Sequence, residues 1–451
     1  MGTLRRNTEL GLLILGSVIT GGTYTLASLG RTASIPADIG PFLAVVLGLL
    51  LAAHVVTRRL AREGDGLLLP IAGLLNGIGY VFIARLNTDL AALQATWTLV
   101  GITAYAATLM FVPRIRPLEG YRYTFAAIGV GLLLVPLIPG LGREINGARI
   151  WASVGPINFQ PGEFAKIVLA LFLAAYLVET RELLAMQTFR VGPFVVPDPR
   201  HFAPLVLAWG TSLVVMVAEK DLGSSLLFFT LFLVLVWVAT ERAAYLVAGG
   251  AMFAAGAVLA WSRFAHVQSR VDIWLNPWAD PKGAGFQPVE AAFALADGGL
   301  TGTGPGLGSP GKIPAAETDF IFAVIGEELG LFGASAILIA FLLMAGSGLR
   351  IAVRSEDPFS KLLATGLTTL LGFQAFIIVA GVIRVLPLTG VTLPFVSYGG
   401  SSLVANYILL ALLVRISDDS SRRSRQRRDE QERRAVVDEL RSSDPAAEAG
   451  R

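Results

Sequence analysis

Cysteine is absent from this chain of 451 residues, and histidine occurs only at His54, His201 and His266. The absence of cysteine excludes a disulfide framework and a thiolate metal site. Three histidines far apart in sequence argue against a histidine-based zinc site. None of them is placed to serve a nucleophilic serine, so a Ser-His-Asp hydrolase is not expected.

Charge is scarce as well. Only 15% of the residues are charged and 54% are hydrophobic, whereas soluble domains carry about 25% charged residues. The formal net charge is only +3, and the basic excess is spread over loops, so nucleic acid is not an expected partner. The composition therefore indicates a protein that is solvated by lipid.

Long apolar runs make up most of the chain. A membrane span needs roughly 20 mostly apolar residues, and the first run, from about Leu10, lacks a signal-peptide cleavage site and is read as a span. We predict an all-α polytopic membrane protein with about 12 transmembrane helices. They lie near residues 9–29, 38–57, 66–84, 92–112, 122–140, 161–179, 203–218, 222–240, 243–263, 319–346, 359–383 and 395–415.

Arginine and lysine concentrate in alternate short loops, and the positive-inside rule assigns those loops to the cytoplasm. Both termini are then cytoplasmic, and the long connection 264–318 lies outside. We divide the chain into N-terminal helices (1–120), a core (121–416) and a tail (417–451). The tail is rich in Arg, Asp, Glu and Ser and is predicted to be a disordered cytoplasmic extension. Contact of its SRRSRQRR run (421–428) with anionic lipid headgroups is the alternative to full solvation.

Charged residues mark the outer end of the sixth span, in NGARIWASVGPINFQPGEFAKIV (146–168). Glu163 and Lys166 are three positions apart, so they share a helix face and can pair. Pairing would offset the cost of desolvating Lys166 inside the span. Two interpretations stay open: a structural ion pair, or the charged floor of an outer cleft with Arg149 as an anion ligand.

Four further acidic positions raise the same choice. Asp221, in EKDLGSS (219–225), is expected to cap the eighth helix. Thr318 and Asp319 are cap-type residues at the start of TDFIFAVIGEELG (318–330). Glu327 and Glu328 would lie deep in that span and need a partner or a proton, and spacing alone does not say whether the partner is structural or catalytic.

The outer loop holds two ambiguous motifs. TGTGPGLGSPGK (301–312) is either a flexible loop or a phosphate cradle with Lys312 adding charge. In NPWADPKGAGFQ (276–287), Asp280 precedes a proline, which by itself favours a turn-forming role over a chemical one. The stretch LPLTGVTLPFVSYGGSSLVANY (386–407) interrupts the last span. Such irregular backbone is tolerated at membrane depth only when buried in protein or lining a wet cavity.

Taken together, these motifs resemble the SEDS (shape, elongation, division, sporulation) family of RodA and FtsW, the bacterial peptidoglycan glycosyltransferases. The matching pieces occur in family order over roughly 146–415, namely NGARIW with QPGEFAKI, DLGSS, NPWADPKGAGFQ, GGLTGTGPGLG, PAAETDFIFAVIGEELG and LPLTGVTLPFVSYGGSSLVANY. Family members usually have ten spans, so two extra helices precede the shared core here, an arrangement that resembles actinobacterial RodA.

The resemblance implies an enzyme of the cytoplasmic membrane that polymerises lipid II on the outer face for cell elongation and shape. It implies that Asp280 is the essential carboxylate, and that Glu163, Lys166 and Arg149 contribute to the site. Lys312 is a further candidate cation, and a divalent ion, Mg²⁺ or Mn²⁺, is an alternative source of charge. The implied partners are lipid II, membrane lipids and a class B penicillin-binding protein.

The chain departs from the family pattern at four positions: Gly162, Glu290, Ala291 and Glu317. These departures leave Asp280 and the Glu163–Lys166 motif intact, and they bear on local contacts around the loop. Two alternative functions remain: an FtsW-like septal polymerase, and a flippase for the lipid-linked precursor. An outer-loop carboxylate and the lack of a visible internal repeat favour an enzyme over a transporter.

Overall fold

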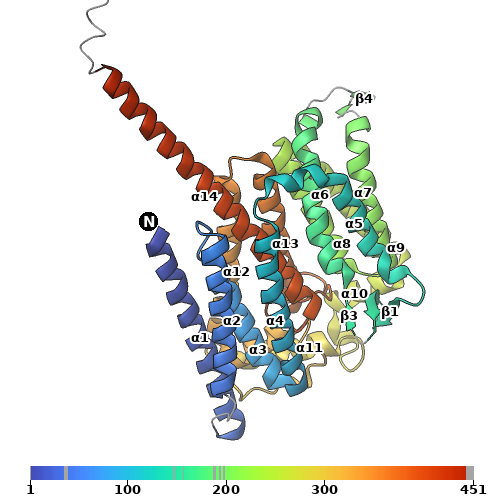
Figure 1. Ribbon diagram of the computed structural model, residues 1–451. Helices are drawn as coiled ribbons and strands as arrows, with labels where there is room; N and C mark the ends of the chain where they lie inside the picture. The colour runs from blue at the N-terminus through green and yellow to red at the C-terminus, as the bar shows by residue number, and fades with distance from the viewer. Residues whose placement is uncertain are drawn as a thin grey trace, which may run out of the picture.

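Long helices form the body of the molecule in the computed structural model, which describes residues 2–34, 39–145, 148–155, 157–185, 189–191, 194–196 and 199–442 (Figure 1). Nine helices of this described part are long and apolar enough to cross a membrane. The all-α polytopic fold class is therefore confirmed. The long helices are α1 (Gly2–Thr32), α2 (Ile39–Leu60), α3 (Leu68–Leu86), α4 (Thr88–Phe111), α5 (Arg122–Leu134), α6 (Pro161–Ala185), α7 (Pro199–Ala218), α8 (Leu222–Thr240), α9 (Ala243–Arg263), α12 (Ile321–Arg354), α13 (Pro358–Val382) and α14 (Gly400–Ser442).

Short elements lie between these helices. A three-stranded antiparallel sheet in the order β1-β2-β3 joins α5 to α6, and a two-stranded β4-β5 ribbon lies between α6 and α7. The predicted outer loop contains two short helices, which the sequence analysis did not predict. The short elements are η1 (Arg116–Tyr121), η2 (Val135–Leu137), β1 (Gly142–Ile145), β2 (Ala148–Val154), β3 (Ile157–Phe159), β4 (Phe189–Val191), β5 (Phe194–Val196), α10 (Ala265–Leu275), η3 (Pro277–Ala279), α11 (Phe286–Gly298) and η4 (Pro310–Lys312).

The two ends of the helical body differ. Figure 1 places the β1–β3 sheet, α10 and α11 at the end opposite to the one from which α14 extends. Near the centre, α6 packs against α8, α13 and α14, while α1 packs along α3 and α14 along α4. The helices α6, α13 and α14 therefore carry their side chains into one shared interior.

Two local irregularities shape the predicted outer end. Gly330 has φ 65° and ψ −168° and breaks α12, a conformation that glycine adopts without steric cost. The freed N–H groups of Leu331 and Phe332 donate to the carbonyls of Gly299 and Leu300. The last span begins at Gly400 rather than near residue 395, because the preceding stretch is an irregular loop.

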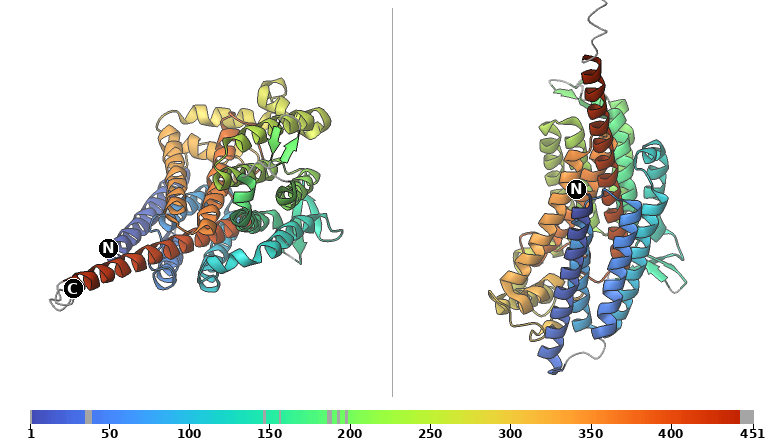
Figure 2. Two further views of the ribbon diagram at one scale, coloured as in Figure 1. Left: turned by 90° about the horizontal axis from the view of Figure 1, so that it is seen from above. Right: turned by 60° about the vertical axis from the view of Figure 1, so that its left-hand side comes forward.

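The predicted disorder of the tail is contradicted up to Ser442, because α14 continues as one helix to that residue (Figures 1 and 2). The helix is already nucleated by the span, so each further turn avoids the nucleation cost. Ion pairs also fix three arginines near the start of the predicted tail. Arg422 pairs with Asp418, Arg425 with Glu63 and Arg427 with Glu356. The last part of the predicted tail, 443–451, lies outside the described residues.

Candidate functional site

The Glu163–Lys166 pair is buried at the start of α6. Lys166 Nζ lies 2.9 Å from both carboxylate oxygens of Glu163, and the two residues are only 3% and 4% exposed. Pro161 begins the helix, and the i to i+3 spacing brings the two side chains together. Pairing offsets the desolvation of both charges, as the sequence predicted.

A glutamine from α13 completes the coordination of Lys166. Gln374 Oε1 accepts a hydrogen bond from Lys166 Nζ at 2.9 Å, and Gln374 Nε2 donates to the Thr392 carbonyl at 2.8 Å. The side chain is 2% exposed. Sequence reasoning missed this residue. A single glutamine in an otherwise apolar span is a signal that would have indicated it, since a polar group at membrane depth is costly.

The network continues into the irregular loop 386–399 and α14. Thr392 Oγ1 donates to Ser402 Oγ at 2.8 Å, and Asn406 Nδ2 donates to the same oxygen at 3.3 Å. Ser401 Oγ accepts from the Gln160 N–H directly before α6. The loop is buried, as its composition requires, with side chains such as Val391, Leu393 and Phe395 in the core.

A narrow pocket adjoins the pair. It is lined by both polar and apolar side chains, namely Glu163, Lys166, Ile167, Leu370, Gln374, Ala405, Asn406 and Leu409. The polar residues gather where α6 begins. The pocket therefore belongs to the polar network around the pair.

The turn between α7 and α8 lies beside this network. Asp221 caps α8 as predicted, since its Oδ1 accepts from the Ser224 N–H at 2.9 Å, and its carboxylate is in electrostatic range of Lys166. Glu219 is buried with Oε1 unpaired among the described residues. Burial, and to a smaller extent the charge of Asp221, raises the pKa of Glu219 to about 8. This carboxyl is therefore mostly protonated at neutral pH.

Arg149 lies on β2, and its side chain is exposed. Its backbone N–H donates to the Glu219 carbonyl at 3.2 Å, which ties the strand to the α7–α8 turn. The first two residues of the NGARIW motif, Asn146 and Gly147, lie outside the described residues. Arg149 thus reaches the neighbourhood of the Glu163–Lys166 pair through the turn that carries Asp221.

Asp280 is exposed on the loop between η3 and α11. Its Oδ1 accepts from the Gly283 N–H and its Oδ2 from the Ala284 N–H, each at 3.0 Å. The turn-forming role that the Asp-Pro sequence favoured is therefore confirmed. Each carboxylate oxygen has two acceptor positions, so both keep one that can face solvent. Forming the turn and accepting a proton are compatible.

The glycine-rich segment 301–312 does not form a phosphate cradle. Several of its N–H groups already donate inside the protein: Gly306 to Glu328 Oε2 and Ser309 to Glu327 Oε1, each at 2.7 Å, with Thr303 and Gly304 donating to helix carbonyls. Two buried carboxylates on this face would repel an anion. The partners of Glu327 and Glu328 are thus structural.

Arginine completes the attachment of that segment. Arg85 Nε lies 3.4 Å from Glu328 Oε1, and Arg85 Nη2 donates to the carbonyls of Gly306 and Gly308. Lys312 is exposed at the end of the segment. No hydrogen bond or ion pair among the described residues joins Lys312 to the Glu163–Lys166 pair.

The expectation that Thr318 and Asp319 cap α12 is wrong. The helix begins after Phe320, which makes no side-chain cap. The Thr318 and Glu317 carbonyls instead accept from Ser397 Oγ and the Tyr398 N–H. Burial raises the pKa of Asp319 to about 6, although the charge of Arg270 opposes the shift. Arg270 also donates to the Leu388 and Thr389 carbonyls.

The structure brings some candidates together and leaves others apart. Glu163 and Lys166 form one cluster with Gln374, whereas Arg149 has an exposed side chain and is tied by its backbone N–H to the neighbouring α7–α8 turn. Among the described residues, no hydrogen bond or ion pair links Asp280 to that cluster. No set of three His, Cys, Asp or Glu side chains in the described part could hold a metal ion.

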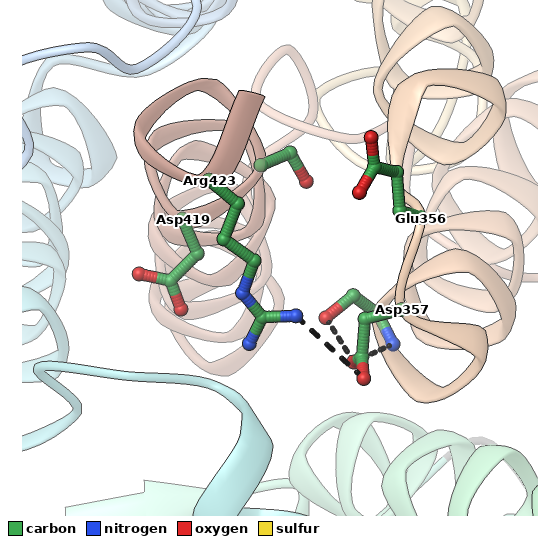
Figure 3. Close-up of a pocket in the computed structure, with 6 residues that line it drawn as sticks. Glu356, Asp357, Asp419 and Arg423 are labelled. Atoms are coloured by element: carbon green, nitrogen blue, oxygen red, sulfur yellow. Dashed lines mark hydrogen bonds and ion pairs between the residues drawn. The ribbon is translucent and has the colours of Figure 1, made fainter. Parts of the chain in front are cut away.

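A second pocket lies at the other end of the bundle, between the start of α13 and the extension of α14. Figure 3 shows Arg423 reaching toward Asp357, with the Nη1–Oδ1 distance at 3.7 Å. The Ser360 N–H and hydroxyl also donate to Asp357, and the Ile115 N–H donates to Asp419. These contacts fasten the extended helix to neighbouring loops, so they account for this acidic cluster.

Comparison with known proteins gives a consistent family. Residues 66–422 match the FtsW/RodA/SpoVE family of cell cycle proteins. The chain is 45% identical, over 99% of its own length and 95% of the relative, to the peptidoglycan glycosyltransferase RodA of Mycobacterium tuberculosis. It is 36% identical, over 63% of its length and 76% of the relative, to a probable peptidoglycan glycosyltransferase FtsW of a Geobacter species.

Solved structures agree. One, from work on the structural coordination of polymerization and crosslinking by a peptidoglycan synthase complex, gives a TM-score of 0.65 at 27% identity and covers 79% of this chain and 98% of its own. The rod shape determining protein RodA of Thermus thermophilus gives 0.55 at 26% identity, with coverage of 79% and 97%.

Proposed function

The chain belongs to the FtsW/RodA/SpoVE family and is a peptidoglycan glycosyltransferase of the RodA type, and from that premise we propose that it polymerises lipid II with Asp280 as general base. The FtsW relatives are more distant and match less of the chain. A role in elongation therefore has more support than a septal one.

One observation supports Asp280 above the other acidic residues. Its carboxylate is exposed, held by two backbone N–H groups, and still has an open acceptor position on each oxygen. Glu163 is committed to Lys166, Glu327 and Glu328 to the glycine-rich segment, and Asp221 to the cap of α8. A base must be within reach of the proton that it removes, and a fixed, exposed carboxylate meets that need.

In the reaction we propose, the acceptor sugar hydroxyl loses its proton to Asp280 as its oxygen attacks the anomeric carbon of the donor. The bond from that carbon to the phosphate oxygen breaks, and the undecaprenyl pyrophosphate leaves with the electron pair. The configuration at the carbon inverts. The leaving group needs no proton, so one carboxylate suffices, in contrast to the carboxylate pair of glycoside hydrolases.

Cations would stabilise the departing pyrophosphate. Lys166 and Arg149 are the candidates, because preorganised positive charge acts where negative charge develops. The glycine-rich segment already uses several of its N–H groups on Glu327 and Glu328, which leaves Lys312 as the weakest of the candidates.

Placement and partners follow from the same premise. We propose a multi-pass protein of the cytoplasmic membrane with both termini inside and the loop 264–318 outside. A class B penicillin-binding protein would then cross-link the product. The four departures from the family pattern are compatible with this chemistry. Ala291 is buried in α11, and Glu317 contributes its backbone carbonyl rather than its side chain to the Tyr398 contact.

A lipid II polymerisation assay in detergent tests the proposal. We expect glycan chains from the wild type and a rate lower by about 10²–10⁴-fold in Asp280→Asn. Asp297→Asn is the matched control, since Asp297 is an exposed carboxylate of α11 and should leave the rate unchanged. A wild-type rate in Asp280→Asn would refute the base. Transport of lipid II without polymerisation would support the flippase instead.

A further inference from the structure

Gln374 stands out because both ends of its amide have partners that dictate its orientation. Lys166 Nζ has only donors, so the atom facing it must be the amide oxygen, and the Thr392 carbonyl only accepts, so the atom facing it must be the nitrogen. A flipped amide would lose both hydrogen bonds. The assignment is therefore fixed by chemistry as well as by distance.

The position of Gln374 links two parts of the site that are far apart in sequence. On one side lies the Lys166 ammonium, which also contacts Glu163. On the other lies the irregular loop, whose Thr392 hydroxyl bonds to Ser402 on α14. The amide is the shared connection between α6 and this loop, and it is 2% exposed.

Lys166 itself has little freedom. An ammonium has three donors, and the two Glu163 oxygens and the Gln374 oxygen each lie 2.9 Å from Nζ. Acceptors on α6 and α13 together set the direction of the ammonium. Without the α13 acceptor, Lys166 would keep its counter-charge but lose the contact that aims it away from α6.

We propose that Gln374 is a positioning residue for the glycosyl transfer: its amide aims the Lys166 ammonium and holds the 386–399 loop in register with it. This inference rests on the proposed function. Gln374 acts through Lys166 and Thr392 rather than on the sugar. Its loss should therefore lower the turnover rate more than it weakens donor binding.

The first variant removes the amide. Gln374→Leu keeps the volume but offers no acceptor to Lys166 and no donor to Thr392. We expect kcat for lipid II polymerisation to fall by about 10–10²-fold, since small misplacements of a catalytic group cost this much, while KM changes by less than about threefold. Gln94→Leu is the matched control. Gln94 is also a fully buried glutamine in a span, and its amide has no hydrogen-bond partner among the described residues.

The second variant gives a readout that general destabilisation would not produce. A protonated carboxyl has the shape of an amide, with a carbonyl for Lys166 and an O–H for the Thr392 carbonyl. Gln374→Glu should therefore recover activity relative to wild type as the pH is lowered. At higher pH its carboxylate would oppose the Thr392 carbonyl and compete with Glu163 for Lys166. The titratable groups facing the position are Glu163, Lys166 and Asp221.

The outcomes are distinct. The proposal is supported by three results. The wild type is active, kcat falls in Gln374→Leu but not in Gln94→Leu, and the activity of Gln374→Glu relative to that of the wild type rises as the pH is lowered. A wild-type kcat in Gln374→Leu, or a pH-independent ratio for Gln374→Glu, would overturn the positioning role alone. A wild type that makes no glycan would overturn both this role and the proposed function. Monodispersity and the midpoint of thermal unfolding, measured in parallel, exclude misfolded variants.

Discussion

The ammonium of Lys166 lies 2.9 Å from both carboxylate oxygens of Glu163, and both side chains are buried. This pair joins the beginning of α6 to the network that runs through α13 and α14. A buried pair of this kind gives little net stability, but loss of one partner leaves an uncompensated charge. A positioned cation therefore explains the pair better than a contribution to stability does.

The first prediction concerns this pair. Lys166→Met should destabilise the protein by about 3–5 kcal/mol, because the Glu163 carboxylate stays buried without its cation. The double variant Glu163→Gln with Lys166→Met should lose clearly less than the sum of the two single losses. Unfolding in detergent, followed by intrinsic fluorescence, measures all three. Strictly additive losses would show that the two side chains do not depend on each other.

The second prediction concerns the attachment of the glycine-rich segment. Glu328→Gln weakens the contacts of residue 328 with Arg85 and the Gly306 N–H. Hydrogen bonds to a charged group contribute about 1.5–3 kcal/mol, so the segment should open more often. Trypsin cleavage after the exposed Lys312 should then become several-fold faster, a measure of local opening.

Glu317→Gln is the control for that experiment, because the Glu317 side chain makes no hydrogen bond or ion pair among the described residues and its backbone carbonyl, which Tyr398 uses, is unchanged. Cleavage after Lys312 should keep the wild-type rate in this variant. Equal cleavage in Glu328→Gln and the wild type would mean that residue 328 does not hold the segment.

The third prediction is a pH dependence from Asp319. Its pKa is about 6 in the folded protein against an ordinary value of 3.8, so the folded state binds the proton more tightly. The free energy of unfolding should therefore fall as the pH rises from about 4 through about 6. Above that range the ionised carboxylate costs roughly 1–3 kcal/mol.

Asp319→Asn removes this group and supplies the comparison. The variant should be more stable than the wild type at about pH 7.5 and equal to it near pH 4. Midpoints of denaturant unfolding at the two pH values measure the difference. A difference that is the same at both would assign the effect to packing rather than to the proton.

The fourth prediction concerns the extension of α14. Arg425 and Arg427 pair with Glu63 and Glu356, so the amides of residues 417–427 should exchange hydrogen more slowly than an unstructured chain. Replacing both glutamates by glutamine should accelerate their exchange, because surface pairs that act together contribute measurable order. Exchange followed by mass spectrometry resolves this peptide.

Arg428 supplies the control, since it is exposed and has no ion pair among the described residues. Arg428→Ala should leave exchange in 417–427 unchanged, as most surface substitutions do. Exchange at the random-coil rate in the wild type would restore the original expectation of a disordered tail.

The sequence by itself determined the features whose energies are local. Apolar length set the spans, the i to i+3 spacing paired Glu163 with Lys166, and cap and turn chemistry placed Asp221 and the backbone contacts of Asp280. These depend on neighbours within four residues. The same local reasoning could not separate a flexible glycine-rich loop from a phosphate cradle.

Only the tertiary structure decided the contacts between distant segments. Gln374 meets Lys166 across 208 positions of sequence. Arg85, Glu327 and Glu328 bind the backbone of the glycine-rich segment. Glu63 and Glu356, which lie in loops, form ion pairs with arginines of the tail helix. Such partners depend on how the helices pack, because two side chains interact only once the fold has placed them face to face. The composition of the tail predicted disorder because it contains no sign of Glu63 and Glu356, the carboxylates outside the tail that Arg425 and Arg427 meet.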